Sequence, residues 1–190
     1  MSELDFCSRY FPKDTYIITI SGTDGKSTVT WMIYNLLQSV TTPEKVHISG
    51  NFEYPLSDTL TDILKLPLDQ QDRHIIVVEV SSFMAYSLME FSPDMTIITN
   101  LESDHLNWHR NLEEYFLSKA NLITRAKDGS FITNQVHTKL QEIGYHFPEN
   151  ISLYGLGVQE HYPTISIDTE RSIDIRETHF LGVHNAVNID

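Results

Sequence analysis

The segment from Tyr16 to Val40 constrains the fold more than any other part of the sequence. An apolar run over residues 16–20 leads into Ser-Gly-Thr-Asp-Gly-Lys-Ser-Thr, and apolar residues at helical spacing follow at once. Those residues share one face of a helix: Val29, Met32, Ile33, Leu36, Leu37 and Val40. The pattern therefore predicts a strand, a glycine turn and an amphipathic helix in direct succession.

The predicted turn carries residue types that suit a phosphate group. Glycines let backbone N–H groups approach, a helix N-terminus adds positive partial charge, and Lys26 can reach terminal phosphates. The complete P-loop pattern also asks for a glycine where Ile20 stands, so only the shorter form G-x-x-G-K-S-T is present. A ligand-free glycine turn is the alternative, but the flanking strand and helix favour a nucleotide site. Its predicted residues are Gly22, Thr23, Asp24, Gly25, Lys26, Ser27 and Thr28, with Ser27 or Thr28 able to ligate Mg²⁺.

Composition limits the class of protein. With 190 residues, 41% of them hydrophobic, the chain suits one globular domain. A net charge of −13 argues against nucleic acid or an anionic membrane as partner. The single cysteine, Cys7, rules out an intramolecular disulfide framework and fits a reducing compartment. No apolar run approaches a membrane span, and the first residues lack the basic start of a signal peptide, so we expect a soluble, cytoplasmic protein.

The clearest strand is the apolar run over residues 74–80, which we expect in the centre of a parallel sheet. Glu79 lies near its carboxyl end, where ligands bind in open α/β sheets. A buried carboxylate needs a partner, so Glu79 is predicted to hold Mg²⁺ beside the glycine turn, with a local salt bridge as the alternative. Ser81 and Ser82 follow, either as hydroxyl ligands or as caps of the next helix.

A second buried strand over residues 95–100 is followed by two acids and two histidines within residues 101–109. That group suits a metal, although polar loops often hold such residues, and His109 is interpreted as structural. A helix is predicted over Leu112–Arg125, and Lys119 stands on its apolar face. Spacing alone favours a lysine that exposes its ammonium group, and a functional lysine is the other interpretation.

The remaining segments complete the expected fold. Shorter elements are predicted at residues 45–48 (strand), 60–66 (helix), 130–134 (strand) and 136–143 (helix). Short β-like runs follow at residues 151–154, 164–167, 172–175 and 179–181. The predicted fold is an α/β, P-loop-type, mostly parallel sheet flanked by helices, with a small β-rich appendage near the C-terminal part. Residues 1–15 are interpreted as a linker.

Five motifs stand in a fixed order, and together they resemble the central ATP-binding domain of the Mur ligase family. They are the glycine turn, Gly50-Asn51, Glu79-Val80-Ser81-Ser82-Phe83, Thr99 to Leu106 with Glu114-Tyr115 and Lys119, and Gly182 to Asn188. The resemblance covers residues 16–190. It implies that residues 1–15 are a linker from a missing N-terminal domain and that a C-terminal domain is missing too.

The resemblance implies an ADP-forming amide ligase. ATP phosphorylates a carboxylate, and an amino acid's amine attacks the acyl phosphate. Lys26 would hold the β- and γ-phosphates, Ser27 and Glu79 one Mg²⁺, and His105 a second. Lys119 matches a lysine that the family carbamylates with CO₂, and the carbamate helps to hold the second metal. Asn51 and Ser81 would lie at the muramoyl-peptide substrate; the residues on the adenine side would be His184, Asn185 and Asn188.

Within the family the likeness leans to the ligases that join D-glutamate to a UDP-linked muramoyl-L-alanine. The chain departs from their usual residues at Glu53, Met84 and Asn107. The alternatives are a Mur-family ligase for another amino acid or for folate or polyamide substrates, a P-loop ATPase or kinase, and a non-catalytic module. Because catalysis needs a closed geometry, the 190 residues alone are expected to bind ATP weakly and to have little or no ligase activity.

Overall fold

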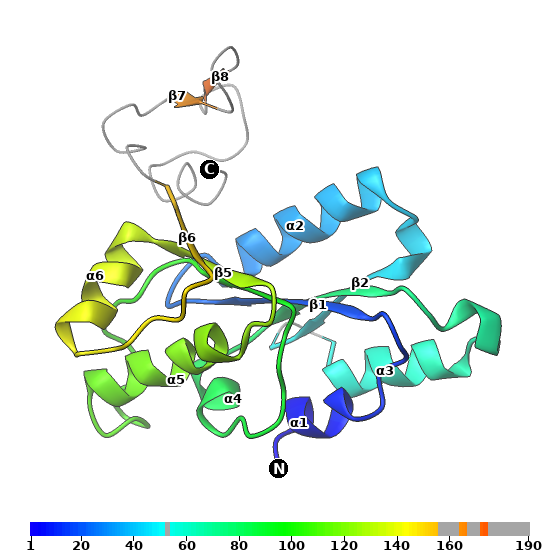
Figure 1. Ribbon diagram of the computed structural model, residues 1–190, viewed down its shortest axis with the longest axis horizontal. Helices are drawn as coiled ribbons and strands as arrows, with labels where there is room; N and C mark the ends of the chain where they lie inside the picture. Colours follow the sequence, from blue (N-terminus) through cyan, green and yellow to red (C-terminus); the bar gives the residue numbers. More distant parts are fainter. Residues whose placement is uncertain (52–53, 156–163, 167–171, 175–190) are drawn as a thin grey trace.

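A six-stranded parallel sheet forms the middle layer of the computed structural model, which describes residues 1–51, 54–155, 164–166 and 172–174 (Figure 1). The strand order is β2-β3-β1-β4-β5-β6. The strands are β1 (Tyr16–Ser21), β2 (Val46–Gly50), β3 (Ile75–Glu79), β4 (Met95–Ile98), β5 (Gly129–Thr133) and β6 (Ile151–Tyr154). A separate antiparallel pair joins β7 (Thr164–Ser166) to β8 (Ser172–Asp174). The predicted α/β class with a mostly parallel, helix-flanked sheet is confirmed.

Helices cover both faces of the sheet. They are α1 (Glu3–Ser8), α2 (Lys26–Val40), α3 (Leu56–Lys65), α4 (Ser82–Tyr86), α5 (Leu112–Arg125) and α6 (Asn134–Glu142), with 3₁₀ turns at Pro43–Lys45 and Leu68–Gln70. Figure 1 shows α2 on one face and α1, α3, α4 and α5 on the other. No helix in the described part of the chain is long and apolar enough to cross a membrane.

The strand order places the site. β1 lies between β3 and β4. The strands β2 and β3 lie on one side of β1, and the later strands β4, β5 and β6 lie on the other side. Ile20 pairs with both Glu79 and Ile97, which brings the carboxyl ends of three strands together. In open parallel sheets this switch point is where ligands bind. The glycine turn leaves β1 there, as the sequence predicts.

Helix α2 buries only part of its predicted apolar face. Val29 is buried against Ile18, Ile20 and Val77, but Leu36 is 61% exposed and Val40 68% exposed. Figure 1 shows the reason, since α2 diverges from the sheet towards its carboxyl end. The predicted helix is confirmed, and Leu36 and Val40 of its apolar stripe are exposed to solvent.

The predicted β-rich appendage included a strand that belongs to the main sheet. Residues 151–154 form β6, which pairs in parallel with β5 from Ser130↔Ile151 onward and so extends the main sheet. Helix α6 provides the crossover that a parallel pair requires. The described part of the appendage is the β7–β8 pair, and the predicted run at residues 179–181 lies outside the described residues.

Residues 1–15 contain a helix that the sequence analysis did not predict. Ser2 and Asp5 form a capping box at the start of α1, and Leu4 and Cys7 are buried in the core. Asp5 also accepts backbone N–H groups from Met89 (3.0 Å) and from the two residues after it. The segment interpreted as a linker therefore contains a helix that packs on the core, and its relation to a further domain stays a prediction.

Replacing Asp5 with asparagine should lower the free energy of unfolding by about 2–4 kcal/mol at neutral pH, because three buried N–H groups lose a charged acceptor. Burial alone raises the pKa of this carboxyl, but N–H groups of Phe91, Glu90 and Met89 hold it well below its usual range. Its contribution is therefore full above the unfolded-state pKa of about 3.9 and declines as the pH falls below that value.

Urea denaturation between about pH 6 and about pH 3 would measure this difference. The matched control is Asp69→Asn, which changes an exposed carboxylate and should leave stability almost unchanged. A gap between wild type and Asp5→Asn that stays constant down to about pH 3 would contradict the assignment.

Candidate functional site

The glycine turn after β1 is shaped by the end of β4. Gly22 has a φ of 147°, and a Cβ there would lie 2.0 Å from Thr99 Oγ1, so only glycine fits. Thr99 Oγ1 donates to the Asp24 carbonyl at 2.6 Å. The Asn100 side chain both accepts from the Asp24 N–H (2.9 Å) and donates to its carbonyl (2.9 Å). The turn is thereby fixed before any ligand arrives.

Helix α2 begins at the turn, with Gly25 as its N-cap. The N–H groups of the first helical turn have no intrahelical acceptor, so they are available to an anion together with the positive end of the helix. Lys26 Nζ donates to the Thr23 carbonyl at 2.7 Å, across the mouth of the turn. Ser27 is exposed and Thr28 is half-buried, so this end of α2 is open to a ligand.

Glu79 is 2% exposed at the end of β3, and both of its carboxylate oxygens have donors. Ser27 Oγ donates to Oε2 at 2.7 Å, and Asn51 Nδ2 donates to Oε1 at 3.0 Å. Gly50, with a φ of 103°, lets β2 approach, since a Cβ there would lie 2.2 Å from the Glu79 carbonyl. The structure thus brings together three predicted site residues from three elements.

This donor set fits magnesium held mainly by phosphate and water. Mg²⁺ takes one or two protein carboxylates, keeps several waters and uses substrate phosphates as further ligands. Glu79 and Ser27 supply a carboxylate and a hydroxyl beside the N-terminus of α2. Within the described residues no three His, Cys, Asp or Glu side chains gather around one point, so a complete protein cage is not present there.

Lys119 is buried on α5 and points at the glycine turn. It is 2% exposed, and its Nζ donates to the Gly22 carbonyl at 2.6 Å and lies 4.8 Å from the centre of the Tyr115 ring. Burial, and then the nearby positive charge of Lys26, lower the pKa of Lys119 to about 7. The expectation that this side chain exposes its ammonium group was wrong, because the turn after β1 covers its end.

His105 stands on the loop after β4, with a positive φ of 52°. Its Nε2 lies 3.3 Å from Asp104 Oδ2, and its ring contacts Phe83 at a centroid distance of 4.9 Å. The Tyr115 ring contacts both His105 (6.1 Å between centroids) and Lys119, so these two predicted metal-site residues flank one aromatic side chain.

His109 anchors the loop that carries His105. It is buried, its Nε2 is 3.0 Å from Ser82 Oγ, and its backbone N–H donates to the His105 carbonyl at 3.1 Å. Burial lowers its pKa, which keeps the ring neutral. Its Nδ1 has no hydrogen-bond partner in the described structure and faces Glu114 Oε2 at 4.0 Å. The ring therefore ties the start of α4 to the His105 loop.

The other predicted site residues differ in how far the structure describes them. Ser81 is the N-cap of α4, and its Oγ accepts the Met84 N–H at 3.3 Å, which is the capping role that was one of its two interpretations. Its side chain is 9% exposed. The three residues assigned to the adenine side, His184, Asn185 and Asn188, lie outside the described residues.

A comparison with models of protein families matches residues 20–189 to the "Mur ligase middle domain". The chain belongs to the Mur ligase family. The match covers most of the chain and includes the glycine turn, Glu79 and Lys119.

Curated relatives of this Mur ligase domain carry the name UDP-N-acetylmuramoylalanine–D-glutamate ligase. The protein from Thermosipho melanesiensis is 32% identical over 137 residues, which are 70% of this chain and 30% of that protein. The protein from Clostridium kluyveri is 29% identical over 198 residues, which are 99% of this chain and 40% of that protein. The chain thus spans well under half the length of these relatives.

Solved structures share the fold of this Mur ligase domain at low identity. MurF ligase from Thermotoga maritima in complex with ADP gives a TM-score of 0.54 at 19% identity, over 80% of this chain and 34% of that one. The bifunctional folylpolyglutamate synthase/dihydrofolate synthase from Yersinia pestis, complexed with AMPPNP and Mn ion, gives 0.52 at 13% identity, over 98% and 54%.

Sequence reasoning gave no role to the residues that shape the site without facing a ligand. Thr99 and Asn100 hold the glycine turn, and Tyr115 bonds Thr23 through its hydroxyl (3.1 Å) and contacts Lys119 through its ring. A signal was available for the first two, since polar residues end a strand that the topology sets beside β1. Tyr115 sits on the apolar stripe of α5 and is indistinguishable from a core residue in sequence.

Lys119→Met should make the protein more stable near pH 6, in buffer freed of CO₂ and metal, because a buried charge is removed. The pKa of Lys119 is about 7 when folded and about 10.4 when unfolded, so between these values the unfolded state binds more protons. The wild type should therefore gain stability relative to the variant as the pH rises from about 7 to about 10.

Chemical denaturation across this range measures the effect, with Lys127→Met as control, since Lys127 is exposed and paired with Asp94. Parallel pH profiles of wild type and Lys119→Met would show that Lys119 is not buried as described.

Proposed function

We propose that this chain is the ATP-binding middle domain of an ADP-forming amide ligase that adds D-glutamate to UDP-N-acetylmuramoyl-L-alanine. The observation that carries the proposal is the meeting of a helix N-terminus, a buried carboxylate and a buried lysine around one glycine turn. The names of the curated relatives support the choice of D-glutamate.

ATP would bind with its phosphates over the glycine turn. The first-turn N–H groups of α2 would bind phosphate oxygens, and Lys26 would leave the Thr23 carbonyl to contact the β- and γ-phosphates. The substrate carboxylate would take the γ-phosphoryl group, and ADP would leave. The amine of the amino acid would then attack the acyl carbon, forming the amide and releasing phosphate.

The proposal includes two magnesium sites. Glu79 and Ser27 would hold one ion and His105 would contribute to the second, with Asn51 and Ser81 on the side of the muramoyl-peptide substrate. Bound Mg²⁺ neutralises the charge that develops on a transferring phosphoryl group. Asn51 shares the Glu79 carboxylate with Ser27, so in this proposal it would lie between the metal and the carboxylate substrate.

Lys119 would contribute to the second magnesium site as a carbamate. A neutral amine attacks CO₂: the nitrogen–carbon bond forms, one proton goes to solvent, and an anion replaces the amine. The lowered pKa of Lys119, about 7, provides the neutral amine at physiological pH. Without this change an ammonium group at Nζ would repel a divalent cation.

The complete ligase would need parts beyond these residues. The chain covers 30% and 40% of two relatives named as D-glutamate ligases. The proposal therefore includes further domains, one that binds the UDP end and one that delivers the amino acid. Residues 1–15 would connect to the first of them, and His184, Asn185 and Asn188 would contact adenine. We place the enzyme in the cytoplasm, where ATP and UDP-linked precursors are found.

Lys26→Ala should weaken MgATP binding by about 10- to 100-fold, because a charge-assisted phosphate contact is lost. Isothermal titration calorimetry of the 190-residue chain measures it. The control is Lys13→Ala, which removes an exposed lysine before β1 and should bind like the wild type. Equal affinity of wild type and Lys26→Ala would overturn the phosphate assignment.

A chain extended to the length of its relatives should release ADP only when the muramoyl-alanine substrate and D-glutamate are both present. Coupled-enzyme detection of ADP, with L-glutamate, D-aspartate and L-lysine tested in place of D-glutamate, would identify the amino-acid substrate. Preference for another amino acid would overturn the choice of D-glutamate but would still support ligase activity. ADP release without any amino acid would instead indicate a plain P-loop ATPase.

A further inference from the structure

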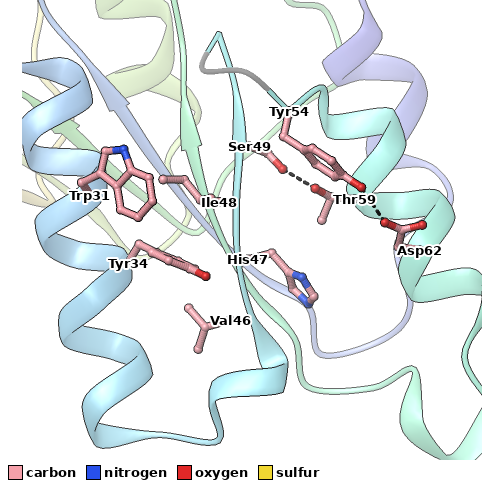
Figure 2. Close-up of a pocket in the computed structure, with 9 residues that line it drawn as sticks. All are labelled: Trp31, Tyr34, Val46, His47, Ile48, Ser49, Tyr54, Thr59 and Asp62. Atoms are coloured by element: carbon pink, nitrogen blue, oxygen red, sulfur yellow. Dashed lines mark hydrogen bonds between the residues drawn. The ribbon is translucent and has the colours of Figure 1, made fainter.

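The free edge of β2 forms the floor of a pocket that none of the glycine-turn residues lines. Its volume is about 410 Å³, within the range of ligand pockets, and it lies between α2 and α3 (Figure 2). Trp31 and Tyr34 of α2 form one wall, and Tyr54, Thr59 and Asp62 form the other.

Within the described part of the chain, the backbone of β2 offers one position inside this pocket that has no hydrogen-bond partner. In a parallel ladder alternate residues direct both backbone groups to the same neighbour. The Asn51 N–H bonds to the Glu79 carbonyl in β3, so Ser49 and His47 also face β3, while Val46, Ile48 and Gly50 face outward.

Two of these outward N–H groups are already used. The Val46 N–H bonds to the Pro43 carbonyl, and the Gly50 N–H bonds to the Tyr54 carbonyl at 2.9 Å. Ile48 directs both its backbone N–H and its backbone C=O into the pocket. The edge is therefore protected at both ends and open in the middle, over a length that suits about three residues of an extended chain.

The two sides of the pocket differ in chemistry. Figure 2 shows Val46 and Ile48 directed towards Trp31 and Tyr34, and His47 and Ser49 directed towards α3. The α2 side is thus aromatic and aliphatic.

The α3 side carries the Asp62 carboxylate, whose pKa is lowered by a hydrogen bond from Tyr54 (2.7 Å). Lys65 lies 3.3 Å from Asp62, but both side chains are mostly exposed and their pairing is weak. Burial, and then His74, lower the pKa of His47 to about 4, so His47 adds no positive charge.

From this geometry we infer that the open edge of β2 binds an extended peptide segment of a partner protein, with a basic–apolar–basic alternation. The central residue pairs with Ile48 in antiparallel sense, exchanging both backbone hydrogen bonds, and its apolar side chain packs on Trp31 and Tyr34. The flanking basic side chains fall on the opposite face, beside Asp62. The net charge of −13 attracts such a segment.

The test uses acetylated, amidated tripeptides and ¹⁵N NMR of the 190-residue chain. Lys-Leu-Lys should shift the Ile48 amide resonance and slow its hydrogen exchange. Leu-Lys-Leu, which inverts the alternation, and Glu-Leu-Glu, which inverts the charge, should each bind about tenfold more weakly. Asp62→Asn should weaken Lys-Leu-Lys by about two- to fivefold.

Two further variants separate docking from loss of structure. Ile48→Pro removes the outward N–H and leaves the bonds to β3, so it should abolish binding with little change in the thermal midpoint. If that variant does not fold, Trp31→Ala serves instead, with Tyr10→Ala as an exposed aromatic control that should bind normally. An unperturbed Ile48 amide, or equal binding of Lys-Leu-Lys and Leu-Lys-Leu, would overturn the proposal.

Discussion

The site depends on the buried carboxylate of Glu79. A carboxylate at the end of an apolar central strand is costly to bury unless donors surround it. Ser27 and Asn51 supply those donors, one from the start of α2 and one from the end of β2. The same hydrogen bonds that stabilise the carboxylate therefore fix the positions of the start of α2 and of the neighbouring strand end. A change at any of the three residues would disturb both packing and ligand binding.

A second constraint is the balance of positive charge around the glycine turn. Lys26 and Lys119 approach the turn from α2 and from α5, and each donates to one of its carbonyls, Thr23 and Gly22. Two ammonium groups so close, one of them buried, disfavour each other, and the acids Asp104, Glu79 and Asp24 offset this only in part. Burial, and then the charge of Lys26, lower the pKa of Lys119 to about 7, so that about half of the buried amine is deprotonated at neutral pH.

Local patterns predicted the elements well and their environment less well. The glycine turn, β3 and α5 follow from periodicity and strand-end chemistry, which are properties of adjacent residues. The burial of Lys119 beneath the turn depends on a contact between residues 97 positions apart, and spacing on one helix cannot encode it. The same limit explains β6, whose pairing with β5 decides its place, and α1, whose short capping box lies in a segment with weak periodicity. The family resemblance links Lys119 to the glycine turn because it treats the ordered motifs as a unit, and it gives no information on β6 or α1.

The hydrogen bond from Lys119 to the Gly22 carbonyl has a thermodynamic consequence for the proposed chemistry. A carbamate keeps one N–H on the nitrogen in place of three ammonium protons and adds a negative charge, so capture of CO₂ would change how the glycine turn is held. Nucleotide and CO₂ would then bind to one shared element, and each would alter the other's affinity by the same factor. The turn would act as a coupling between carbon dioxide and the nucleotide, with dissolved bicarbonate as an effector of ATP affinity.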